Sequence, residues 1–203
     1  DEAYIANGVA VHNCAYRTPG YTSSQLFYQI EPGTKGLRRD AEHPDRNYNP
    51  ARFMPAEKAL EILADCQELG VQGIQFTGGG EPTVHPQFRA IVTAARNAGL
   101  SFSLVSNGVN ISRKSYEDIV AQADWVRISL DAAWASTYAA ARDVPPDHFR
   151  SAVDSIKRLV ETRNRLGTSC VIGVGFVVSQ QNWRDVYDFT ALARSIGADN
   201  VRI

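Results

Sequence analysis

The chain has 203 residues, 44% of them hydrophobic, which is enough for one domain with a sizeable core. Its 21 Lys and Arg balance 22 Asp and Glu, so the net charge of -1 provides no basic field that would attract nucleic acid. We expect a soluble, cytoplasmic chain with no membrane partner and with reduced thiols, because no apolar run is long enough to span a bilayer and the three cysteines are widely spaced.

Residues 4–14 read YIANGVAVHNC, in which a short apolar run leads directly to His12, Asn13 and Cys14. A polar, proline-rich stretch follows at 31–53. This stretch is equally consistent with a solvated loop and with a surface that contacts substrate.

From residue 54 onward, short apolar runs alternate with helical segments, which is typical of βα units. Helices are expected near 55–69, 86–98, 114–122, 133–141, 147–165 and 182–195, several of them ended by a glycine. Strands rich in β-branched or aromatic residues are expected over 73–77, 101–106, 125–130, 170–179 and 200–203. The pattern predicts an α/β fold with a full or partial (β/α) barrel, and a doubly wound sheet is the alternative.

Small polar and glycine residues follow three successive predicted strands. The first strand runs into TGGGEP, the second ends in Ser-Asn-Gly, and the third ends in Ser-Leu-Asp. A binding site for a polar small molecule at a barrel mouth needs such residues, although each of them also suits a tight turn or a helix cap. The candidate residues are Gly78, Gly79, Gly80, Glu81, Ser106, Asn107, Ser129 and Asp131.

The segments GIQFTGGGEPTVHPQF, SLVSNG, WVRISLDA, VGFVVSQQN and VRI occur in this order, and together they resemble the core of radical S-adenosylmethionine (radical SAM) enzymes. The resemblance implies a partial (β/α) barrel in which the five predicted strands are strands two to six and the first strand is missing. It also implies two cofactors, a 4Fe-4S cluster and S-adenosylmethionine, which together generate a 5'-deoxyadenosyl radical. An electron donor such as flavodoxin or ferredoxin is implied as a partner.

The resemblance also assigns roles to the strand-end residues. Gly79, Gly80 and Glu81 would receive the amino group of the cofactor's methionine, with Gly78 beside them. Ser129 and Asp131 would lie near its ribose or carboxylate, and Ser106 and Asn107 would line the same mouth. The backbone around Val177 and Arg202 would approach the adenine.

The cluster motif of the family, C-x3-C-x2-C, is absent, because Thr18 and Tyr21 stand four and seven residues after Cys14. Cys66 falls in a predicted helix whose apolar face includes Leu60 and Leu63, and Cys170 opens a predicted strand. Both cysteines are therefore expected to be small core residues. Cys14 would be the third cysteine of the motif, and the first two would lie on an upstream segment.

Residues 1–13 resemble the C-terminal end of an intein, in which Val-His-Asn precedes a Cys, Ser or Thr of the host protein. The resemblance implies that Cys14 is a nucleophile, that Asn13 closes a succinimide and that His12 assists the cleavage. It divides the chain into an intein remnant (1–13) and a radical SAM core (14–203). The rest of the intein would lie upstream, so this chain would not splice alone.

Two other functions remain open on the sequence. One is a degenerate barrel without a cluster that serves as a binding or assembly module. The other is a metal-independent barrel lyase or aldolase, although no lysine stands at a predicted strand end. The substrate is not predicted.

Overall fold

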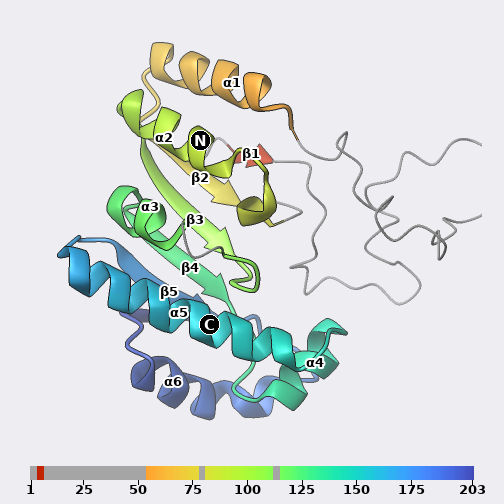
Figure 1. Cartoon of the computed structure of the whole chain (residues 1–203). Helices are drawn as coiled ribbons and strands as arrows, with labels where there is room; N and C mark the ends of the chain where they lie inside the picture. Colours follow the sequence, from red (N-terminus) through yellow and green to blue (C-terminus); the bar gives the residue numbers. More distant parts are fainter. Residues whose placement is uncertain (1–3, 7–53, 78–80, 112–114) are drawn as a thin grey trace, which may run out of the picture.

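The computed structural model describes residues 4–6 as backbone, together with residues 54–77, 81–111 and 115–203. All described strands form one parallel sheet in the order β1-β2-β3-β4-β5-β6 (Figure 1). The strands are β1 (Tyr4–Ala6), β2 (Gly73–Thr77), β3 (Ser101–Ser106), β4 (Trp125–Ser129), β5 (Val171–Gly175) and β6 (Asn200–Arg202). Because spatial order follows chain order without reversal, the sheet is not doubly wound but is consistent with a partial (β/α) barrel.

Helices connect the successive strands and lie along one side of the sheet (Figure 1). They are α1 (Ala56–Glu68), α2 (Phe88–Asn97), α3 (Ser115–Gln122), α4 (Ala135–Arg142), α5 (Asp147–Leu166) and α6 (Val186–Ser195), with short 3-10 turns η3 (Pro82–Val84) and η4 (Trp183–Asp185). Each helix overlaps a predicted one. As predicted, a glycine with positive φ follows α1, α2, α5 and α6, because the left-handed conformation there is costly for other residues.

One further strand lies beside β2, in the short apolar run near the start of the sequence. Residues Tyr4–Ala6 form β1, and Ile5 pairs with Phe76 in parallel register. A Tyr-Ile-Ala segment has high strand propensity, and its backbone hydrogen-bonds to the otherwise unpaired edge of β2.

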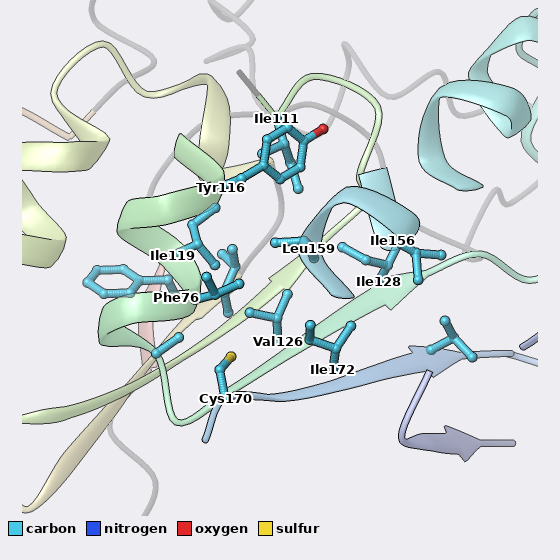
Figure 2. Packing of buried hydrophobic residues seen from close by; sticks show 14 of the residues in the cluster. Phe76, Ile111, Tyr116, Ile119, Val126, Ile128, Ile156, Leu159, Cys170 and Ile172 are labelled. Carbon is cyan, nitrogen blue, oxygen red and sulfur yellow. The ribbon is translucent and has the colours of Figure 1, made fainter. Parts of the chain in front are cut away.

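The core lies between the sheet and the helices. On β4, Val126 and Ile128 alternate with the partly exposed Trp125, Arg127 and Ser129, so one face of the sheet is apolar and the other is polar. Figure 2 shows the apolar face of β4 and β5 beneath side chains of α3 and α5. The residues shown there include Ile119, Val126, Ile128, Ile156, Leu159 and Ile172.

Cys66 and Cys170 are buried, free thiols, as predicted. Leu63 is buried beside Cys66 on α1, but Leu60 is 42% exposed, so its assignment to the apolar face was wrong. Helical geometry explains the difference, because the buried positions Ala59, Leu63 and Cys66 recur at intervals of four and three and leave Leu60 off the stripe. No helix among the described residues is long and apolar enough to cross a membrane.

Candidate active site

Glu81 is the centre of a hydrogen-bond network that joins the end of β2 to the end of β3. Its Oε1 accepts from Ser106 Oγ at 2.7 Å and from the hydroxyl and amide of Thr83 at 2.6 and 3.1 Å. Its Oε2 accepts from the amide of Asn107 at 2.6 Å. Ser106 Oγ in turn accepts from the amide of Gly108 at 3.0 Å. Three predicted site residues, Glu81, Ser106 and Asn107, are therefore in direct contact.

The exposure of Glu81 differs from the sequence-based expectation. We expected its carboxylate to face an open mouth, whereas the residue is fully buried. The side chain folds back over η3, where it caps the turn, and reaches across to β3. A carboxylate has about four acceptor positions. Oε2 makes one hydrogen bond among the described residues, so it retains capacity for a further donor.

Asp131 joins the ends of β4 and β5 in the same way. It has a φ of 55°, a left-handed conformation that Asp tolerates better than most residues. Its Oδ1 accepts from the amide of Val177 at 2.8 Å, and its Oδ2 pairs with Arg142. Arg142 also donates to the carbonyl of Ser129 at 2.9 Å. The predicted residues Ser129, Asp131 and Val177 are thus connected, and Arg142 of α4 links them.

Two buried residues after β5, Asn182 and Asp185, hold the segments that follow β4 and β5 in place. Neither was predicted as a site residue from the sequence. Asn182 Nδ2 donates to the carbonyls of Asp131 and Val177, both at 2.9 Å. Asp185 accepts from the amide of Ala133 at 2.9 Å. Asn182 ends the segment VGFVVSQQN, which carries part of the family resemblance. Its place in that segment is the signal that could have identified it.

Tyr138 lies close enough to both networks to sense their charges. It is buried on α4, and its ring is 5.0 Å from the guanidinium carbon of Arg142. Burial raises the pKa of the Tyr138 phenol, Arg142 opposes that shift, and the carboxylates of Asp131 and Glu81 add to it. Both carboxylate networks lie at the carboxyl ends of neighbouring parallel strands, so they form one polar region at this edge of the sheet.

Arg202 and Val177 lie at the edge of this region. The carbonyl of Arg202 accepts from the amide of Phe176 at 2.8 Å, so β6 is held beside the end of β5. The side chains of Val177 and Arg202 are both exposed. The Val177 amide already donates to Asp131. The Val177 carbonyl accepts one hydrogen bond, from Asn182, and a carbonyl oxygen can accept two.

The described residues contain no group of three or more His, Cys, Asp or Glu side chains arranged to hold a metal. Cys66 and Cys170 lie in the core away from the strand ends, and burial raises the pKa of the Cys170 thiol to about 12. The predicted residues His12, Asn13, Cys14, Gly78, Gly79 and Gly80 lie outside the described residues. The described strand ends therefore fit a polar small molecule but not an iron-sulfur cluster.

A parallel α/β barrel segment with polar side chains at its strand ends defines the class of protein. The model of the radical SAM superfamily matches residues 14–192, and the chain belongs to this family. The family uses a 4Fe-4S cluster and S-adenosylmethionine.

Curated relatives and solved structures agree with this family. The chain is 32% identical over 152 residues to the mycofactocin maturase MftC of Mycolicibacterium smegmatis, which covers 72% of this chain and 36% of that protein. It is 29% identical over 145 residues to the tungsten-containing aldehyde ferredoxin oxidoreductase cofactor-modifying protein of Pyrococcus furiosus, covering 69% and 40%. The structure of Streptococcus suis SuiB bound to precursor peptide SuiA has the same fold, with a TM-score of 0.61 at 18% identity, covering 73% and 32%. The chain thus spans well under half the length of these proteins.

Proposed function

We propose that this chain is the downstream part of an enzyme that cleaves S-adenosylmethionine reductively and removes a hydrogen atom from a substrate. The cluster and S-adenosylmethionine supply the 5'-deoxyadenosyl radical when both are bound. The observation that carries the proposal is the pair of carboxylate networks at the ends of β2 to β5, within a chain of this family. An electron donor such as flavodoxin or ferredoxin would complete the system.

The residues at the strand ends would bind and orient S-adenosylmethionine. Among the described residues, Oε2 of Glu81 accepts one hydrogen bond, and its remaining capacity suits the cofactor's ammonium group, which Gly79 and Gly80 would also receive, with Gly78 next to them in the sequence. Ser106 and Asn107 would hold that carboxylate in place.

Asp131 would act mainly by position. Both of its carboxylate oxygens are engaged, so it fixes the Val177 backbone against which the adenine would lie. Ser129 would lie beside the ribose or carboxylate, and Arg202 would support the adenine from β6. Asn182 secures the same backbone from the other side, which keeps the proposed adenine contact rigid.

The cluster would be held by Cys14 together with two upstream cysteines. Residues 1–13 would be the end of an intein, so that Cys14 is the splicing nucleophile before it becomes an iron ligand. Asn13 would form the succinimide that breaks the bond to Cys14, with His12 polarising the carbonyl or protonating the leaving amine. The division into a remnant (1–13) and an enzyme core (14–203), and the upstream segment as partner, belong to the same proposal.

A peptide is the substrate class that the relatives favour. The PqqA peptide cyclase of Gluconobacter oxydans matches over 70% of this chain, whereas the S-adenosylmethionine-dependent nucleotide dehydratase of Flammeovirga pacifica matches over 43%. The longer match supports a peptide or peptide-like substrate over a nucleotide.

Anaerobic reconstitution of the mature, spliced protein with iron and sulfide tests this function. We expect a brown protein that forms 5'-deoxyadenosine from S-adenosylmethionine under reducing conditions. A mature protein with all three motif cysteines that binds no iron-sulfur cluster would instead identify a degenerate barrel. A cluster on the isolated chain that depends on Cys66 or Cys170 would refute the role of Cys14.

A further inference from the structure

Two arginines flank β5 on the polar face of the sheet. Arg127 of β4 pairs with Gly173 of β5, and Arg202 of β6 pairs with Gly175 of β5. The strands β2 to β6 contain no Asp or Glu at any position. A positive region therefore lies on this face without an acidic partner from the strands.

The glycines of β5 make room for side chains from both neighbouring strands. A Cβ on Gly175 would lie 3.3 Å from Cδ of Arg127, and a Cβ on Gly173 would collide with the side-chain oxygen of Asn200. Arg127 therefore extends across β5 toward the position that pairs with Arg202. The side chains of Arg127 and Asn200 thus lie directly over the glycine backbone of β5.

Arg127 stacks on Trp125 and has no charged partner among the described residues. Its guanidinium carbon lies 4.9 Å from the centre of the Trp125 ring. Its Nε is buried and makes no hydrogen bond within residues 54–77, 81–111 and 115–203, and Arg202 makes no side-chain ion pair within those residues. Burial, and then the positive charge of Arg202, lower the pKa of Arg127. Buried donors of this kind are normally satisfied, and the part of the chain that the structure describes supplies no acceptor for Arg127 Nε.

A cavity lies beside Arg127 and Asn200, toward the amino ends of β4, β5 and β6. Its volume is about 220 Å³, and it is lined by Trp125, Val126, Arg127, Val171, Gly173 and Asn200. This volume is below the range of about 300 to 1,000 Å³ that is usual for whole ligands, so it suits one arm of a larger molecule.

We propose that Arg127 and Asn200, with the positive charge of Arg202 nearby, form an oxyanion-binding site that receives a carboxylate or phosphate on one arm of the substrate. A planar guanidinium donates two parallel hydrogen bonds to such a group, and the Asn200 amide supplies another donor. The assignment to substrate rests on the proposed function. Glu81 and Asp131, proposed to act on the cofactor, lie in the loops beyond the strands, whereas Arg127 lies within β4.

Titration calorimetry of the 203-residue chain tests the site, with glutarate, its uncharged analogue glutaramide, and inorganic phosphate as probes. We expect glutarate or phosphate to bind and glutaramide not to bind. The anion that binds more tightly indicates whether the substrate arm carries a carboxylate or a phosphate. Arg127→Met keeps an unbranched stem over Gly175 and removes the charge, so affinity for that anion should fall at least about tenfold. Its melting temperature should not fall, because Arg127 makes no ion pair within the described residues that the substitution would break.

Arg184→Met is the matched control, because Arg184 also stacks on a tryptophan, at 4.4 Å from Trp183, but on the surface. It should leave anion binding unchanged. The site would be refuted if neither anion bound better than glutaramide, or if both variants weakened binding equally. Displacement of the anion by S-adenosylmethionine would assign the site to the cofactor and overturn the substrate assignment. The assay needs no cluster and no turnover, so its failure would leave the proposed radical chemistry intact.

Discussion

Replacing Glu81 with Gln should destabilise the fold because the carboxylate is buried and accepts four hydrogen bonds on two oxygens. An amide has only one acceptor oxygen. If the amide oxygen takes the place of Oε1, the NH2 group faces the backbone amide of Asn107. If the oxygen takes the place of Oε2, the NH2 group faces the donors of Ser106 and Thr83. At least one buried donor is left without an acceptor in either case.

The size of the loss follows from these contacts. An unsatisfied buried donor costs about 1 to 3 kcal/mol. The remaining bonds change from charged to neutral acceptors, which weakens each by about 1 kcal/mol, although the contacts within the Glu81 to Thr83 turn are partly exposed and contribute less. We expect the free energy of unfolding to fall by about 2 to 4 kcal/mol.

Urea denaturation of the chain, followed by circular dichroism, measures this change. Glu61→Gln is the matched control, because Glu61 pairs with Lys58 at 2.7 Å on the exposed surface of α1. The control should leave the unfolding free energy essentially unchanged. A Glu81→Gln variant that is as stable as Glu61→Gln would refute the structural role of this carboxylate.

Three further predictions concern the loops and the core. Asn182→Ala should lower the unfolding free energy by about 2 to 3 kcal/mol, because the carbonyls of Asp131 and Val177 lose a buried donor, and an unchanged urea midpoint would contradict this. Gly108→Ala should destabilise by at least about 1 kcal/mol, since φ is +73° and the new Cβ would meet a buried β4 side chain at 2.9 Å, whereas wild-type stability would refute the strain. Burial raises the pKa of Cys170, so the folded state keeps this proton when the unfolded state has lost it, and stability should fall as pH rises from about 9. Cys170→Ala should show a smaller fall between pH 8 and pH 10 in urea titrations, and an identical fall would contradict the shift.

Short apolar runs that alternate with helical segments located the strands of the sheet. The bounds of β2 and β3 match the predicted ranges 73–77 and 101–106. The strand predicted over 170–179 ends at Gly175 instead, although the apolar run continues. The amide of Val177 donates to Asp131 rather than to a neighbouring strand, and this contact spans 46 residues. No local pattern in the sequence reveals such a partner.

The composition of the strand ends predicted the candidate site, but the hydrogen bonds and ion pairs that connect its residues were not predictable. Ser106, Asn107 and Asp131 were identified from their places after strands. The burial of Glu81 and the pairing of Arg142 with Asp131 depend on how α4 and η3 fold over the sheet. Polar residues on a helix have many possible partners, so Arg142 gave no signal before the tertiary structure was known.

The central claim is that one sulfur, that of Cys14, serves first in splicing and then in iron binding. The measurement that tests it most directly is the yield of 5'-deoxyadenosine from a Cys14→Ser precursor, read together with its splicing on a gel. A hydroxyl can still act as the nucleophile, but it is a poor ligand for iron that prefers thiolates. The account predicts a spliced product that forms no 5'-deoxyadenosine, while Asn13→Ala keeps the intein attached. Full 5'-deoxyadenosine production by Cys14→Ser, or normal release of the intein by Asn13→Ala, would contradict it.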